Sequence, residues 1–188
     1  MRLPYWVLRL LHQQKLSRSR IRGGLLHSWL GDRILEANEK IVSTTGEVRI
    51  VSGSQTLETP RKPELGWPKE LTMYNRTSKE GLNFVRMPVR FLKLNNDIAI
   101  WSAPIELFCE VSNEVRERSP FPDTFYYGYT NGWFGYMPTS EEWTFGGYEV
   151  ERVSPFTPAA AGELTALVLG YFQGKIRNEP PAAQRRRK

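Results

Sequence analysis

Residues 124–148, TFYYGYTNGWFGYMPTSEEWTFGGY, concentrate the aromatic side chains and glycines of the chain. The run of aromatics in residues 124–129 predicts a buried strand whose successive rings pack on both faces of a sheet. Asn131 and Gly132 then end that strand, because both residue types favour turns. We interpret this segment as the main indication of function and the rest of the chain as its structural support.

The segment SAPIELF, residues 102–108, precedes this aromatic stretch and supplies the second candidate feature. A predicted strand ends near Ser102, and Glu106 is expected to open a helix that carries Val111 and Val115 at helical spacing. Strand-to-helix junctions collect functional side chains in α/β folds, because the strand fixes the backbone while the turn exposes the side chain. The purely structural alternative is that the Glu106 carboxylate lies at the start of a helix and accepts hydrogen bonds from the free N–H groups of its first turn.

Further strands are predicted on both sides of a short turn. Residues 47–60 combine β-branched side chains with alternation, which indicates a strand. Residues 85–91 and 98–101 flank a turn at residues 95–97 and predict a β-hairpin. Pro88 lacks an N–H donor, so the first strand of this hairpin should have a bulge or an edge there.

Helical patterns occur at both ends and within the aromatic stretch. Residues 25–42 place Leu26, Leu30 and Ile34 on one face of an amphipathic helix, and residues 159–172 predict a closing helix rich in Ala and Leu. Thr139 followed by Glu142 is a capping-box pattern, which predicts a short helix that ends before Gly146. Together these elements predict an α/β fold with a mixed sheet and packed helices.

The charge distribution argues against binding of nucleic acid. The net charge of the 188 residues is +6, but residues 1–23 hold six basic and no acidic side chains, and residues 174–188 hold six basic and one acidic. The remaining chain carries 14 basic and 19 acidic side chains, a net charge of −5. The basicity therefore belongs to the ends of the chain, where it is typical of solvated tails.

These observations divide the chain into three predicted regions. Residues 1–23 form a basic N-terminal extension, which is similar to a mitochondrial transit peptide or is simply a disordered extension. Residues 24–175 form one α/β portion, and residues 176–188 form a disordered basic tail. No apolar run reaches the roughly 18 residues typical of a membrane span, and the sequence leaves the compartment undetermined.

Few residues are suited to metal binding or nucleophilic chemistry. Cys109 is the sole cysteine, which excludes an intrachain disulfide, and its apolar helical surroundings favour a buried, inert thiol. His12 and His27 are the only histidines, and neither belongs to a metal-binding pattern. His27 is expected to be an ordinary surface or core residue. Neither a nucleophile elbow nor a phosphate-binding loop occurs.

The run APIELFCEVSNEVRERSPFPDTFYYGYTNGWFGYMPTSEEWTFGGYEVE resembles the final part of the catalytic domain of the neutral (alkaline, non-lysosomal) ceramidase family. In that family a strand leads into a Pro-Gly-Glu junction, and a later strand leads into Gly-Tyr-x-Asn, an aromatic loop, Tyr-x-x-Thr and Gly-Gly-Tyr-Glu. The similarity is specific over residues 98–153. It departs from the family at Ala103, Pro104 and Ile105, which stand where a Pro-Gly pair is usual.

The resemblance implies hydrolysis of the amide of N-acylsphingosines by a zinc ion that two histidines, a glutamate and a tyrosine bind. The glutamate of the junction motif corresponds to Glu106, and the tyrosine five residues after Asn131 corresponds to Tyr136. A carboxylate is an ordinary zinc ligand, and a phenol binds when the metal lowers its pKa enough to release the proton. The alternative for Tyr136 is a packed aromatic with a hydrogen-bonded hydroxyl.

The histidine ligands and the serine of the family have no counterpart in this chain. The resemblance therefore implies a fragment of a larger catalytic domain, which is expected to be inactive alone. Its implied partners are a ceramide-like lipid substrate, a membrane surface, and the missing catalytic half or another chain; nucleic acid is not expected. The alternative function is a non-catalytic lipid- or protein-binding module that uses exposed Trp133 and Phe134.

Overall fold

The computed structural model describes residues 20–41 and 46–174, and these divide into two compact units between Glu47 and Val48. The first unit contains helix α2 (Arg20–Glu39). This helix confirms the predicted one but begins five residues earlier, and Leu30 and Ile34 are more than half exposed. Most of the predicted extension and tail lies outside the described residues, as do the side chains of Leu26 and His27. The domain boundaries therefore stay predictions.

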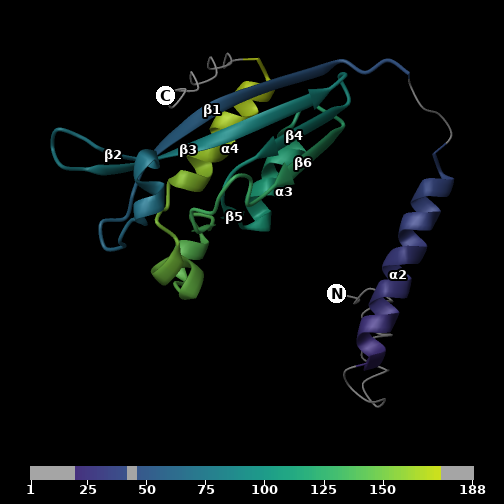
Figure 1. The fold of residues 1–188 in the computed structure, drawn as a ribbon, viewed down its shortest axis with the longest axis horizontal. Helices are drawn as coiled ribbons and strands as arrows, with labels where there is room; N and C mark the ends of the chain where they lie inside the picture. Colours follow the sequence, from purple (N-terminus) through teal and green to yellow (C-terminus); the bar gives the residue numbers. More distant parts are fainter. Residues whose placement is uncertain (1–19, 42–45, 175–188) are drawn as a thin grey trace, which may run out of the picture. The chain divides into compact units, whose positions relative to one another are not determined.

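The second unit is built on a mixed five-stranded sheet with the order β1-β3-β4-β6 (Figure 1). Its main strands are β1 (Ile50–Pro60), β3 (Asn83–Leu94), β4 (Ile98–Ser102) and β6 (Asp123–Tyr127). The short strand β2 (Asn75–Thr77) also pairs with β3. Within this sheet the β4–β6 pair is parallel and the other pairs are antiparallel. The predicted α/β fold with a mixed sheet is confirmed.

The predicted hairpin is formed by β3 and β4, and Asn95 at its turn has a φ of 53°. The Pro88 prediction is confirmed by the register of β3. One edge of β3 pairs with β1 over residues 84–94. On the other edge, β2 pairs with residues 83–85 and β4 with residues 90–94, so Pro88 lies between the two paired stretches. Its missing N–H group is tolerated there because the strand is locally an edge.

Two helices cover one face of the sheet. Helix α3 (Cys109–Arg118) connects β4 and β5 to β6 and buries Val111 and Val115, while α4 (Ala160–Phe172) lies across β1 and β3 (Figure 1). Phe91 of β3 stacks on Tyr171 of α4 with ring centroids 3.8 Å apart. The predicted closing helix is thereby confirmed, with Leu164 and Val168 fully buried. None of the described helices is long and apolar enough to cross a membrane.

The opposite face of the sheet is not covered by α3 or α4. Because side chains alternate along a strand, every second residue points to this side. We call this surface the open face. On β3, β4 and β6 it carries three rows of paired residues: Arg90, Ser102 and Tyr127; Leu92, Ile100 and Phe125; and Leu94, Ile98 and Asp123. Residues of β1 continue the same rows in the register of β1 and β3, namely Ser54, Ser52 and Ile50.

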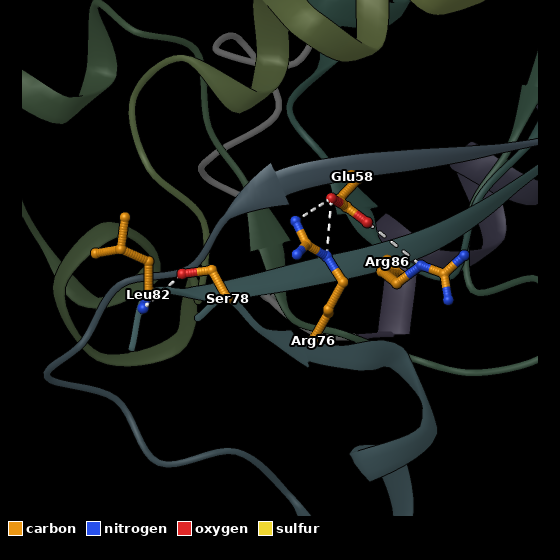
Figure 2. Close-up of polar contacts among 5 residues, drawn as sticks. All are labelled: Glu58, Arg76, Ser78, Leu82 and Arg86. Atoms are coloured by element: carbon orange, nitrogen blue, oxygen red, sulfur yellow. Dashed lines mark hydrogen bonds and ion pairs between the residues drawn. The ribbon is translucent and has the colours of Figure 1, made fainter. Parts of the chain in front are cut away.

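A polar cluster occupies the far end of the same side of the sheet. Figure 2 shows Glu58 of β1 accepting hydrogen bonds from Arg76 of β2. Arg86 of β3 also contacts this carboxylate, with Nε 3.4 Å from Oε2. The turn between β2 and β3 is closed nearby by reciprocal bonds between Ser78 and Leu82. The cluster is partly exposed, so its net contribution to stability is small.

Two expectations about burial are wrong. Strand β6 is not buried on both faces: it ends the sheet order, and Phe125 and Tyr127 are 49% and 57% exposed. Only Thr124 and Tyr126 point to the side that the helices cover. Cys109 is exposed rather than buried, because it is the first residue of α3 and lies outside the face that carries Val111.

Replacing Leu164 with Ala should reduce the free energy of unfolding by about 2–5 kcal/mol, because the fully buried side chain would leave a cavity. Leu167→Ala on the same helix is the matched control, since Leu167 is only partly buried. Denaturant titration followed by circular dichroism measures both. Equal losses for the two variants would contradict the position of α4 on the sheet.

Candidate functional site

The two residues that the sequence identified as metal ligands are direct neighbours in the structure. Glu106 belongs to β5 (Glu106–Leu107) and Tyr136 to β7 (Tyr136–Met137), and the two short strands form a separate parallel sheet. In its register Glu106 is the partner of Tyr136. The Glu106 N–H donates to the carbonyl of Gly135 at 3.1 Å, which fixes this pairing.

Glu106 does not open a helix, contrary to expectation. The helix α3 starts at Cys109, and the chain stays extended through Phe108, whose N–H donates to the Met137 carbonyl at 3.2 Å. The backbone N–H groups of Glu106 and Phe108 are therefore paired with the β7 segment, and the chain does not need to begin a helix here to satisfy them. The carboxylate of Glu106 consequently lies before the helix and accepts a hydrogen bond from another side chain.

The backbone that leads to Glu106 is buried and held by the aromatic segment. Ala103 and Ile105 are 1% and 0% exposed. The Ile105 carbonyl accepts hydrogen bonds from the Tyr126 hydroxyl at 2.9 Å and from the Tyr129 N–H at 3.3 Å. The Phe134 N–H donates to the Pro104 carbonyl at 2.7 Å. The aromatic segment therefore wraps the junction and fixes the position of Glu106.

Tyr129 is the site residue that the sequence analysis missed. Its hydroxyl donates a hydrogen bond to Oε2 of Glu106. Its φ is 54°, in the left-handed region that bulky residues rarely adopt. The aromatic run suggested a core strand, but β6 ends at Tyr127 and Gly128 follows it. The glycine directly after the strand was the available signal that Tyr129 lies outside it.

The two phenols share the Glu106 carboxylate as their strongest electrostatic partner. The hydrogen bond to Glu106 raises the pKa of Tyr129 to about 12, with smaller contributions from burial and from the carboxylate charge. The pKa of Tyr136 is also raised, first by hydrogen bonding to Glu106 and then by burial, the Glu106 charge and the nearby Glu149. Both phenols are therefore protonated at neutral pH, because ionisation would place two negative charges together.

The rest of the aromatic segment forms the surroundings of Tyr136. Thr139 accepts a hydrogen bond from the Glu142 N–H at 3.2 Å, which confirms the capping pattern, although the helix that follows is a short 3₁₀ turn, Glu142–Thr144. A π-helical turn, Tyr148–Val153, comes next and brings Glu149 near Tyr136. These residues surround the phenol with polar and acidic groups.

Of Trp133 and Phe134, which were both expected to be exposed, only Trp133 is. Trp133 is 47% exposed, whereas Phe134 is 5% exposed and packs against Trp67 and Tyr74 with ring centroids 5.9 and 4.9 Å away. The expectation that Phe134 contacts a lipid or a partner is therefore wrong. Its ring points into the core because its N–H is tied to Pro104, which anchors the loop to the junction.

The described residues offer an incomplete set of metal ligands. Within residues 20–41 and 46–174, no three His, Cys, Asp or Glu side chains gather where they could hold a metal. The available donors are one carboxylate oxygen pair from Glu106 and the phenol oxygens of Tyr129 and Tyr136. A carboxylate oxygen is an ordinary zinc ligand, but these donors alone do not complete a four-ligand site. The assignment of Glu106 and Tyr136 as zinc ligands stays a prediction.

Removing the Glu106 charge should lower the pKa of Tyr129 from about 12 toward the ordinary phenol value. The change is Glu106→Gln, and the measurement is a pH titration of the tyrosine ring carbon resonances, assigned with Tyr129→Phe. Glu110→Gln is the control, because Glu110 is exposed on α3. An unchanged Tyr129 titration in the Glu106 variant would contradict the hydrogen bond.

A second prediction tests the close approach of Gly135, the residue before β7, to the backbone of Val153. Gly135 and Gly147 have similar φ angles of 98° and 100°, but a Cβ at Gly135 would lie 2.6 Å from the Val153 carbonyl oxygen, while one at Gly147 meets open space. Both alanine variants should lose about 1–3 kcal/mol from the unfavourable backbone conformation. Gly135→Ala should lose about 1–3 kcal/mol more from the clash. Denaturant unfolding measures the difference, and equal losses would contradict this close approach.

Two solved structures resemble this chain, but no family or curated protein matches its sequence. No protein-family model matches the chain, and no curated protein matches it. A crystal structure of neutral ceramidase from Pseudomonas aeruginosa is similar at 16% identity and a TM-score of 0.46, over 78% of this chain and 31% of that one. A ceramidase complexed with C2 is similar at 16% identity and a TM-score of 0.42, over 63% of this chain and 21% of that one.

The chain thus spans less than a third of the length of either solved structure. At these identities and TM-scores, the likeness neither assigns the chain to a family nor transfers a function. What the described residues establish is an α/β unit that brings Glu106 and Tyr136 together on paired strands.

Proposed function

We propose that this chain is a ceramidase-like fragment of a zinc-dependent amidohydrolase. In this proposal Glu106 and Tyr136 supply two ligands, and residues from other sequence or another chain supply the rest. The substrate class is the N-acyl amide of a sphingolipid, as the motif resemblance over residues 98–153 suggests. The chain by itself should be inactive.

The observation that carries the proposal is the register of β5 and β7. Thirty positions separate Glu106 from Tyr136 in the sequence, yet the two are direct partners in a parallel pair. Parallel partners point their side chains to the same side of the sheet. The two residues that the motif resemblance selects are therefore the two that the fold places side by side.

Zinc, when bound, would polarise a water molecule and lower its pKa toward neutrality. The residues of this chain would hold and orient that ion. The Glu106 carboxylate would be the negatively charged ligand. To bind the metal, it would give up a hydrogen bond that it now accepts from a phenol. Tyr136 would have to lose its proton to bind as a phenolate, and its raised pKa opposes this loss. Metal affinity should therefore increase with pH, because binding releases a proton.

Tyr129 fits a supporting role in this arrangement. Its hydroxyl is hydrogen-bonded to Oε2 of Glu106, and it would keep the carboxylate oriented while Tyr136 exchanges its own hydrogen bond to Glu106 for the metal. Partners of this kind orient the ligand, and their removal typically weakens metal binding by about 10–100-fold. The strained φ of Tyr129 is consistent with such a role, since strain of this kind clusters at functional sites.

The proposal also explains why the chain should lack activity. Efficient amide hydrolysis needs a bound water, a base and donors that stabilise the oxyanion. One carboxylate and two protonated phenols do not form a closed set of zinc ligands. The alternative of a non-catalytic module gains no support, because Phe134 is buried and only Trp133 of the pair is exposed.

Zinc should bind the purified chain weakly and without turnover of ceramide. Calorimetric titration with zinc, elemental analysis and a ceramide hydrolysis assay measure these outcomes. Glu106→Gln and Tyr136→Phe should each abolish the weak binding, whereas the exposed Glu110→Gln should not. Binding should strengthen as pH rises toward the phenol pKa of Tyr136.

Two results would overturn parts of this proposal. Stoichiometric, tight zinc together with ceramide turnover would show that the site is complete without other residues. Zinc binding that Glu106→Gln and Tyr136→Phe leave unchanged would remove these residues from the site. In a completed enzyme, full activity of the Glu106→Ala variant would do the same.

A further inference from the structure

We propose that the open face of the sheet is a self-association surface, on which a second copy of this chain packs face to face. The proposal does not depend on the ceramidase-like function, because it rests on the exposed residues of β3, β4 and β6 and on no property of Glu106 or Tyr136. Three features support it: the apolar side chains of the open face, the hollow in it, and the residues that would meet if a two-fold axis related two copies.

The middle row of the open face is apolar on β3, β4 and β6, and exposed Ser52 of β1 continues it at the polar end. Leu92 of β3 pairs with Ile100 of β4, which pairs with Phe125 of β6. Leu92 and Ile100 are half-buried, and Phe125 is 49% exposed. A sheet face that is meant for water normally alternates to polar side chains at these positions. This row is therefore typical of a face that another layer covers.

The open face carries both a hollow and an exposed aromatic ring. The hollow has a volume of about 490 Å³, and its lining includes Arg90, Leu92, Ile100, Tyr127, Gly128 and Thr130. Phe125 is absent from that lining, is 49% exposed and belongs to the edge strand β6. An exposed ring and a largely apolar hollow on one surface are the elements that an isologous contact needs, because each copy then supplies both.

A two-fold axis along β4 matches the rows of the open face. Such an axis places β4 over β4 of the second copy and β3 over its β6. Leu92 then faces Phe125 of the second copy, and the two Ile100 side chains meet on the axis. Arg90 faces the Tyr127 ring of the second copy, which is a favourable cation–π arrangement. Aligned packing of two twisted sheets has this geometry, with the sheets about 10 Å apart.

The charges of the sheet also favour this partner. Arg90 has no ion-pair partner among the residues that the structure describes, so it is available for the Tyr127 ring. The charged cluster of Glu58, Arg76 and Arg86 lies outside the three rows and is internally paired (Figure 2). Asp123 and Leu94 lie at the rim of the contact, where a charge stays hydrated.

Sedimentation equilibrium of the full chain should show a mass that rises with concentration toward twice that of the monomer. Phe125→Asp should weaken the dimer by at least about tenfold, since an aspartate would be buried against an apolar hollow. Met73→Asp is the control, because Met73 is 76% exposed in the 3₁₀ helix Lys69–Tyr74, away from the open face. Circular dichroism verifies that both variants remain folded.

A cross-linking experiment tests the position of the axis without a destabilising charge. In a Cys109→Ser background, Ile100→Cys should give a covalent dimer with a short bismaleimide, because the two residues face each other on the axis. A reagent is needed because sheets about 10 Å apart are too distant for a direct disulfide. Met73→Cys in the same background should give no covalent dimer, although its non-covalent association is unchanged.

A chain that remains monomeric at its highest soluble concentration would overturn the proposal. So would a dimer that Phe125→Asp leaves intact and that Ile100→Cys does not cross-link, since another surface would then mediate it. Co-sedimentation of a monomeric chain with lipid vesicles, lost in Phe125→Asp, would assign the open face to a lipid surface instead and would likewise overturn it.

Discussion

The candidate site depends on three buried backbone carbonyls at the end of β4. Those of Ala103, Pro104 and Ile105 lie where water cannot reach them, and each accepts a hydrogen bond from the aromatic segment. An unpaired buried carbonyl would be costly, so the segment is required to fold back over this junction. The pairing of Glu106 with Tyr136 follows from that folding, because it continues the same set of backbone bonds.

The carboxylate of Glu106 has two competing uses. In the structure it accepts a hydrogen bond from Tyr129, and its charge raises the pKa of both phenols. This arrangement is stable without a metal, because the protonated phenols satisfy the carboxylate. The same geometry brings three oxygen donors together, which a cation could bind after a phenol loses its proton. Hydrogen bonding therefore organises the site and also opposes metal binding at low pH.

The sheet has two faces with different requirements. One is covered by α3 and α4 and forms the core around Phe91, Trp101 and Leu164. The other is apolar in its middle row and polar near Glu58. The function proposed for the site and the association proposed for the open face rest on different observations, the β5–β7 register for the first and the exposed apolar residues of β3, β4 and β6 for the second.

The sequence by itself determined the local elements. Alternation predicted the hairpin of β3 and β4, helical spacing predicted α2 and α4, and Thr139 with Glu142 predicted a capped turn. These signals are local, because a residue's neighbours in the chain decide its backbone preference. The motif resemblance also selected Glu106 and Tyr136, but it could not establish that they meet.

Only the tertiary structure decided burial and the pairing of distant residues. Cys109 and Phe125 are exposed, and Phe134 is buried, because the sheet order and the helix orientation determine which side chains have a covering layer. Glu106 is in a strand rather than a helix because β7, far along the chain, offers hydrogen-bond partners. Such long-range partners leave no periodic mark in the sequence, which is why local patterns could not predict them.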